Sequence, residues 1–256
     1  MRFDSVTKLF GTSSGQAHRA VHDVTLSVAD GEFVCLVGPS GCGKSTLLAI
    51  AGGFEQPTSG RVLIGETEIT DPGTGAVTVF QDYGLFPWRT VRDNVEYGLQ
   101  VRGVPPAERR ARALAELDAV GLGAFAEWHP HELSGGMRQR VSIARALAVD
   151  PAVLLMDEPF GAVDAINRAR MQEELERLWC EHERTVLFVT HDVDEAIYLA
   201  DRIVLMTPGP GRIAEQIDVT FSRPRVRGSG EFFALRSRIL ETLHLAGTES
   251  RTEFEI

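Results

Sequence analysis

The sequence predicts an α/β protein whose core is a mostly parallel β-sheet. Short, continuously apolar runs at residues 33–37, 153–156 and 185–190 have the length and composition of strands that are buried on both faces. Segments with helical patterning lie between these runs, and alternation of strands with helices favours parallel pairing. Because ligands bind at the carboxyl ends of strands in such sheets, the chemistry is expected directly after the apolar runs.

The first part of the chain predicts an antiparallel β layer beside this core. Residues 3–9 and 20–28 are expected to form strands, joined by a Gly/Ser-rich turn at residues 11–15. Two further short strands are expected at residues 60–65 and 76–81.

A phosphate-loop pattern follows the strand at residues 33–37: a glycine, four residues, and then Gly-Lys-Ser. Glycines let successive N–H groups converge on phosphate oxygens, and the next helix directs the positive end of its dipole at the same anion. Lys44 is expected to neutralise the terminal phosphates, and Ser45 to ligate Mg²⁺. The expected nucleotide-binding residues of this loop are Gly38, Pro39, Ser40, Gly41, Cys42, Gly43, Lys44, Ser45 and Thr46.

Polar residues follow the expected strands where phosphate chemistry needs them. Asp157 would orient the Mg²⁺ shell, and Glu158 would act as general base on the attacking water. Gln81 is placed to reach Mg²⁺ or that water through its amide, and His191 to donate to the γ-phosphate. Alone, Gln81 and His191 would more often be structural.

Composition narrows the classes of protein. A net charge of -10 and a pI near 5.2 argue against a broad nucleic-acid surface, so no nucleic-acid partner is expected. No apolar stretch approaches the roughly 18 residues that a membrane span needs. The three cysteines lack metal-ligand spacing and fit a reducing cytosol.

Residues 87–147 have helical patterning and predict a helical subdomain inserted into the core. It includes an amphipathic helix at residues 107–120 and a helix at residues 138–149. Leu-Ser-Gly-Gly-Met at residues 133–137 predicts either a second anion site at a helix N-terminus or an ordinary N-cap. The tail, residues 223–256, predicts an amphipathic helix that docks on the core. Three arginines beside it are expected to be solvated: Arg223, Arg225 and Arg227.

Taken in order, these motifs resemble the nucleotide-binding cassette of ABC transporters. The similarity covers nearly the whole chain and adds Gly-Ala-Val-Asp, which ends at Asp164, to the motifs described above. It implies that two cassettes close head to tail, with ATP between the phosphate loop of one and the Ser-Gly-Gly turn of the other. It also implies that Phe10 stacks on adenine and that Asp164 crosses the dimer interface. The residues of the Ser-Gly-Gly turn are Ser134, Gly135 and Gly136.

The resemblance also implies a division of the chain. The cassette would span residues 1–222, with the nucleotide core at residues 1–86 and 148–222 and the helical subdomain at residues 87–147. Many members have Ser-Ala-Leu-Asp where this chain has glycine first, so the role of Gly161 is open.

The function implied is that of an ATPase subunit which uses MgATP to drive a separate permease. It would act as a homodimer, or paired with a similar cassette, at the cytoplasmic face of the inner membrane. The stretches at residues 81–88 and 208–213 look like those of importers for nitrate, sulfonates, taurine and similar solutes. A solute-binding protein and the permease would select the solute.

Two other functions remain open at this stage: a soluble ABC-type ATPase of iron–sulfur assembly, repair or translation, and a nucleotide-binding module without activity. Two residues also keep two interpretations each. Trp88 is either an anchor for the permease or part of the subdomain core. Cys42 is either a reactive thiol with a lowered pKa or an inert filler of the phosphate loop.

Overall fold

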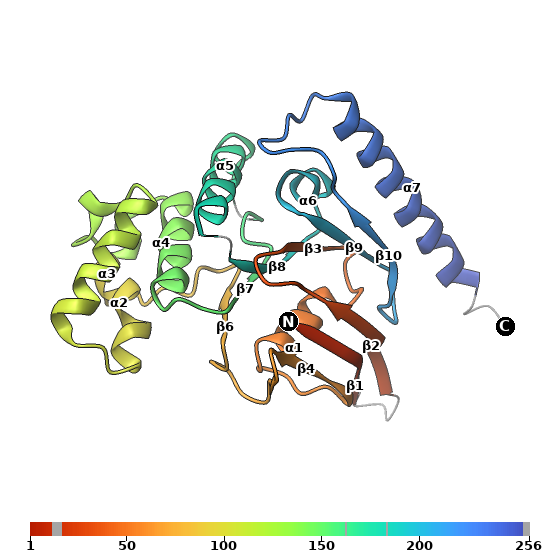
Figure 1. Ribbon diagram of the computed structural model, residues 1–256, viewed down its shortest axis with the longest axis horizontal. Coiled ribbons are helices and arrows are strands. Elements are labelled where there is room, and N and C mark those ends of the chain that lie inside the picture. Colours follow the sequence, from red (N-terminus) through yellow and green to blue (C-terminus); the bar gives the residue numbers. More distant parts are fainter. Residues whose placement is uncertain (12–16, 162, 183, 253–256) are drawn as a thin grey trace. The chain divides into compact units, whose positions relative to one another are not determined.

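The structure is a computed structural model and describes residues 1–11, 17–161, 163–182 and 184–252. The chain divides into two compact units, each described by itself. Unit 1 comprises Met1–Ala76 and Arg184–Ile256, and unit 2 comprises Val77–Glu183 (Figure 1). The predicted α/β class, with a mostly parallel sheet and an antiparallel β layer, is confirmed.

The antiparallel layer belongs to unit 1. Its strand order is β2 (Ala17–Ser27), β1 (Arg2–Gly11), β4 (Ser59–Ile64) and β5 (Thr67–Glu68). Alternate residues of β2, such as Val24 and Leu26, are buried, as period-two patterning requires. Beyond Gly11, the predicted turn lies outside the described residues.

The parallel strands of unit 1 surround β3 (Phe33–Val37). It lies between β8 (Thr185–Thr190) and β9 (Arg202–Met206) and is parallel to both, whereas β10 (Ile213–Asp218) runs antiparallel to β9. All residues of β3 and β8 are buried, which explains their unbroken apolar sequence. Val37 is level with Thr190 and with Leu205, so three strands end together where α1 (Lys44–Ala51) begins.

The tail of unit 1 corrects one prediction. The predicted helical face is confirmed in α7 (Gly230–Thr252), where Phe232 and Ile239 are buried. The prediction of solvated arginines is wrong for Arg225, which is only 5% exposed. Its guanidinium donates to the carbonyls of Ile197 and Tyr198 at 2.9 and 3.0 Å.

These carbonyls end the short helix α6 (Val193–Leu199), and the last carbonyls of a helix have no partner within it. Arg223 donates to the carbonyl of Leu199, and the Arg227 guanidinium lies 3.9 Å from the Tyr198 ring centroid. The arginines therefore cap a helix, because a planar guanidinium reaches several carbonyls and favours the negative end of the helix dipole.

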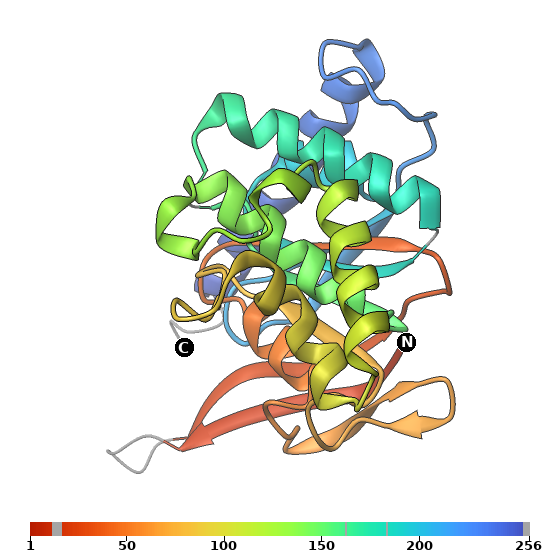
Figure 2. The same cartoon turned by 90° about the vertical axis from the view of Figure 1, so that its left-hand side faces the viewer.

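Unit 2 contains two strands and most of the helices. β6 (Ala76–Val79) and β7 (Val153–Asp157) are hydrogen-bonded neighbours. The yellow and green helices of Figure 2 pack against one another: α2 (Val91–Val101), α3 (Pro106–Ala119) and α4 (Gly135–Ala148). The remaining helices are α5 (Ala165–His182) and two short 3-10 turns, Gly123–Phe125 and Pro130–Glu132.

The boundary between the units does not coincide with the predicted subdomain. Unit 2 begins at Val77 and ends at Glu183, so it includes β7, α5 and all of β6 except its first residue, in addition to residues 87–147. A separate subdomain at residues 87–147 stays a prediction. Among the described residues, no helix combines the length and apolarity needed to cross a membrane.

Candidate functional site

The phosphate loop of unit 1 is shaped by glycine at the start of α1. Gly43 is the N-cap, with φ 87° and ψ 9°, in the left-handed region that favours glycine. A Cβ built there would lie 2.7 Å from the Ala20 carbonyl oxygen, so a side chain would also collide with β2. The first bond within α1 joins the Leu47 N–H to the Gly43 carbonyl at 2.9 Å. The N–H groups before Leu47 consequently point out of the helix, where an anion binds them.

Lys44 places its positive charge inside this loop. The residue is 6% exposed, and its ammonium donates to the Gly38 and Pro39 carbonyls at 2.7 and 3.1 Å. The ammonium also lies 3.7 Å from Cys42 Sγ, and none of these three partners is a carboxylate that would compete with a phosphate for the ammonium. The geometry therefore matches the role that the sequence predicts for Lys44.

Cys42 is fully buried in the same loop. Burial raises the pKa of its thiol, and the nearby Lys44 ammonium offsets only part of that rise. A thiolate is the reactive form of cysteine, so the structure favours the inert interpretation over the reactive one.

His191 leaves the sheet beside the phosphate loop. Because Val37 is level with Thr190, Gly38 and His191 follow neighbouring strand ends. The Thr190 hydroxyl donates to Glu195 at 2.6 Å and accepts the Asp192 N–H at 3.0 Å, which fixes the turn around the exposed His191. The structure thus brings together the two predicted phosphate-contacting parts of unit 1.

Phe10 presents a partly covered ring. It is 37% exposed, near the end of β1, and the Lys8 ammonium lies 5.0 Å from its ring centroid. Lys8 is itself fixed by the Gln56 carbonyl at 2.6 Å. One face of the Phe10 ring is therefore engaged by a cation, which is compatible with a base stacking on the other face.

In unit 2, Gln81 and Glu158 converge on the backbone of Gly161. A Cβ built on Gly161 would lie 3.2 Å from Gln81 Nε2 and 3.8 Å from Glu158 Oε2. The Gly161 N–H donates to the Glu158 carbonyl at 3.0 Å, and Glu158 has φ 44°, an uncommon value outside glycine. Glycine at residue 161 leaves room for the side chains of Gln81 and Glu158. This gives a structural reason for Gly161, whose role the sequence left open.

The Ser-Gly-Gly turn of unit 2 starts α4. Ser134 is the N-cap, and its Oγ accepts the Met137 N–H at 3.3 Å. Because the hydroxyl oxygen accepts this bond, its proton remains to be donated to a ligand. The N-cap interpretation is confirmed, and it leaves the anion-binding interpretation open.

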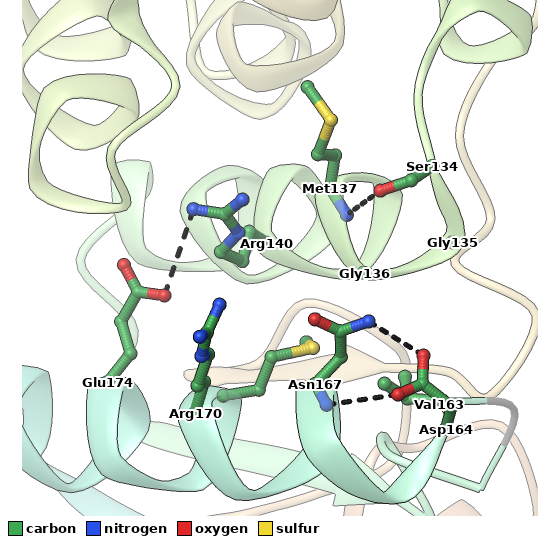
Figure 3. A pocket seen from close by; sticks show the side chains of 11 residues that line it. Ser134, Gly135, Gly136, Met137, Arg140, Val163, Asp164, Asn167, Arg170 and Glu174 are labelled. Atoms are coloured by element: carbon green, nitrogen blue, oxygen red, sulfur yellow. Dashed lines mark hydrogen bonds and ion pairs between the residues drawn. The ribbon is translucent and has the colours of Figure 1, made fainter.

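A cavity of about 400 Å³ lies against this turn (Figure 3). Asp164 lines it and caps α5, accepting the Asn167 N–H at 3.1 Å and its side-chain amide at 2.7 Å. Arg140 and Glu174 face each other at 3.9 Å, and burial raises the pKa of Glu174. The lining residues are Ser134, Gly135, Gly136, Met137, Arg140, Val163, Asp164, Asn167, Arg170, Met171 and Glu174.

Arg145 is a residue that the sequence analysis missed. From α4 its guanidinium donates to the Gly84 and Tyr83 carbonyls at 2.6 and 2.9 Å. It thereby ties the segment after Gln81 to the helix that the Ser-Gly-Gly turn begins. The feature of the sequence that could have identified it is an arginine within the mostly apolar run at residues 141–148.

The residues expected to bind Mg²⁺ fit that ion by their chemistry. Ser45, Gln81 and Asp157 offer oxygen atoms, which Mg²⁺ prefers. Among the described residues, no cluster of three or more His, Cys, Asp or Glu side chains is arranged to hold a metal. A few oxygen ligands supplemented by nucleotide phosphates and water are the usual Mg²⁺ environment.

The predicted site residues fall into two groups. The phosphate loop, Phe10 and His191 belong to unit 1. Gln81, Asp157, Glu158, Asp164 and the Ser-Gly-Gly turn belong to unit 2. Each group is assembled within its own unit, and together they define a class: an α/β protein that binds a nucleoside triphosphate.

The particular family follows from comparison with known proteins. The profile of the ABC transporter family matches residues 21–161, and the chain belongs to this family. The nitrate import ATP-binding protein NrtD of Synechococcus elongatus is 47% identical over 253 residues, covering 95% of this chain and 91% of NrtD. The bicarbonate transport ATP-binding protein CmpD of Synechocystis is 45% identical over 251 residues, covering 95% and 89%.

Solved structures agree with this assignment. The dimeric, post-hydrolysis ATP-binding cassette MJ0796, bound to ADP and Pi, superposes with a TM-score of 0.75 at 34% identity. The match covers 86% of this chain and 99% of that one. The chain is accordingly an ATP-binding cassette with ATPase activity.

Proposed function

We propose that the chain is the energy-supplying subunit of an importer and couples MgATP hydrolysis to solute uptake through a separate permease. The observation that carries this proposal is the presence of two different helix starts suited to phosphate in one chain, at Gly43 and at Ser134. Two copies, or two similar cassettes, would close head to tail so that each ATP is held by both kinds of helix start.

The residues divide the reaction between them. Lys44 and the N–H groups of the phosphate loop bind the terminal phosphates, and Ser45, Gln81 and Asp157 would hold Mg²⁺, which neutralises phosphate charge. Glu158 accepts a proton from the attacking water as its oxygen bonds to the γ-phosphorus and the bond to ADP breaks. His191 donates a hydrogen bond to the γ-phosphate.

The test of this chemistry is Glu158→Gln. Without the carboxylate, turnover should fall by about 10²–10⁴-fold while ATP still binds, because the amide cannot accept the proton. Phosphate release and nucleotide titration measure the two effects. Glu66→Gln is the matched control, since Glu66 is exposed. Near-normal turnover of Glu158→Gln would remove Glu158 from the mechanism.

An aromatic cluster on unit 2 supports a permease partner. Trp88 is 73% exposed, so its interpretation as subdomain core is wrong. Its ring centroid lies 5.6 Å from that of Phe86, which lies 4.7 Å from that of Tyr97. The Arg89 guanidinium lies 4.9 Å from the Tyr97 ring centroid. Exposed aromatic and arginine side chains are the usual anchors of protein interfaces.

Co-purification tests this docking surface. The tagged chain is extracted from membranes in mild detergent, and Trp88→Ala should lose most of the co-purifying permease. Trp128→Ala is the control, because Trp128 is another exposed tryptophan of unit 2, 43% exposed. Retention of the permease by Trp88→Ala contradicts this surface. Recovery with cytosolic partners alone would favour the soluble ATPase.

We infer that the solute is small, in the range of nitrate, sulfonates and taurine, and that the similarity to a bicarbonate transport protein extends this range. The peripheral location at the inner membrane would follow from binding the permease. The solute-binding protein recovered with that permease is the molecule to screen against these solutes.

A further inference from the structure

Unit 1 contains a cavity of its own, which residues outside the phosphate loop line. It has a volume of about 410 Å³ and lies beside β2 and the beginning of β10. This volume is at the lower end of the range of ligand pockets, which suits a small solute. The residues that line it are His22, Asp23, Thr25, Arg212, Ile213 and Gln216.

Three of the lining residues have hydrogen-bonding capacity that the described part of the chain does not use. His22 Nδ1 is buried and has no hydrogen-bond partner among the described residues. Gln216 accepts a bond from Arg202 through Oε1, so its NH₂ group remains to donate. Thr25 Oγ1 accepts the Ser5 N–H at 3.1 Å, which leaves the hydroxyl proton to donate. A buried polar atom without a partner, such as His22 Nδ1, calls for an explanation such as a ligand or water, whereas the exposed Thr25 and Gln216 offer their donors to a ligand from the solvent side.

The cavity also holds two opposite charges that do not neutralise each other. Within the described part of the chain, neither Arg212 nor Asp23 forms an ion pair. An anion alone would satisfy Arg212 but would be repelled by the Asp23 carboxylate. A molecule with an acid group and an amine a few bonds apart satisfies both side chains.

We propose that this cavity is a binding site for a small zwitterion of the amino-acid or aminosulfonate type. Its acid group accepts hydrogen bonds from Arg212 and the Gln216 amide, and its ammonium group donates to Asp23. The site is distinct from the nucleotide-binding residues and from the aromatic surface proposed to contact the permease.

The backbone connects this cavity directly to the phosphate loop. The His22 N–H donates to the Gly211 carbonyl at 2.9 Å, and the Gly211 N–H donates to the Ala20 carbonyl at 3.0 Å. A Cβ built on Gly211 would lie only 1.9 Å from the Cys42 carbonyl oxygen. A ligand that joins Arg212 to Asp23 therefore stiffens the backbone behind the loop. ATP binding then costs less entropy, because part of the loop's backbone is already ordered. The ligand should therefore raise the affinity for ATP, and ATP should raise the affinity for the ligand by the same factor.

The experiment is calorimetric titration of the full chain, without nucleotide, with three probes that share a three-carbon chain: β-alanine, propionate and propylamine. β-Alanine should bind at least tenfold more tightly than either singly charged probe. Arg212→Gln and Asp23→Asn should each weaken its binding at least tenfold. Arg19→Gln, an exposed arginine of the same strand as Asp23, is the control and should bind normally.

A second readout tests the connection to the phosphate loop. Saturating β-alanine should lower the KM for ATP of the native chain about two- to threefold, and this effect should be absent from Arg212→Gln. The site proposal is overturned if β-alanine up to about 20 mM gives no heat, if propionate binds equally well, or if both variants bind normally. Because the titration needs no hydrolysis, its result is independent of the proposed ATPase mechanism.

Discussion

The N-cap of helix α1 is Gly43, a left-handed residue without a side-chain hydrogen bond, whereas the N-cap of α4 is Ser134, whose hydroxyl accepts a bond from the helix. Lys44 brings a buried ammonium into the first of these helix starts. The start of α4 instead opens on a cavity of about 400 Å³ that holds both basic and acidic side chains.

The difference lies in what each helix start supplies by itself. The α1 start combines backbone donors with a cation that the loop itself encloses, so it has everything needed to bind phosphate. The α4 start offers a hydroxyl proton and backbone donors, and the cations described beside it, Arg140 and Arg170, line an open cavity and are not enclosed by the turn. We therefore expect α1 to determine ATP affinity and α4 to matter only after nucleotide is bound.

The largest effect should come from Lys44→Ala, which removes the enclosed cation. Turnover should fall by about 10²–10³-fold and ATP affinity by at least tenfold, because the phosphate charge is no longer neutralised. Phosphate release and nucleotide titration measure these losses. Retention of full ATP affinity would contradict this role of Lys44, since backbone donors alone would then suffice at α1.

The next effect is expected at Gly211, which approaches the phosphate loop from behind. Gly211→Ala should cost about 1–3 kcal/mol of stability and raise the KM for ATP, because its Cβ would collide with the Cys42 carbonyl. Gly209→Ala is the control: an added Cβ there meets no atom within 4 Å. If the two variants have equal stability in denaturant and equal ATPase kinetics, the contact of Gly211 with Cys42 does not support the phosphate loop.

Ser134 should give a smaller effect that separates capping from ligand binding. Ser134→Ala loses the cap, worth about 1 kcal/mol, together with the hydroxyl proton. Ser134→Asn keeps a capping oxygen, so it should retain stability while kcat still falls. Affinity of a single chain for ATP should change in neither variant. A loss of that affinity would show that α4 takes part in the first binding step.

The smallest effect is expected in the alkylation of two cysteines that differ in burial, Cys42 and Cys180. Cys42 is buried and its thiol has a raised pKa, whereas Cys180 is exposed on α5. Iodoacetamide should therefore modify Cys180 about tenfold faster or more, as mass spectrometry of single-cysteine variants would show. Rapid modification of Cys42 that MgATP prevents would restore the reactive interpretation.

Local features of this fold could be predicted from the sequence, whereas features that depend on distant partners could not. The strand at residues 33–37 and the loop after it follow from apolar composition and glycine spacing, and the structure has β3 at Phe33–Val37. The burial of Arg225 depends on carbonyls at Ile197 and Tyr198, which no local pattern specifies. Arg145 was missed for the same reason.

The candidate site shows the same limit. The motifs identified Gln81 and Glu158 separately, but only the structure shows both beside Gly161. Helix α6 and strand β10 were not predicted, because both are short and their sequences are mixed in polarity. The roles of the site residues remain predictions for the experiments above.

The arginine cap on α6 has a consequence for shortened or fused versions of the chain. Truncation at residue 222 would remove Arg223 and Arg225 and leave the last carbonyls of α6 bare. That helix starts one residue after His191, at its cap Asp192. A cassette that ends at residue 222, or a fusion joined there, should therefore lose ATPase activity. Loosening of α6 would displace His191, although the removed segment contains none of the sequence motifs.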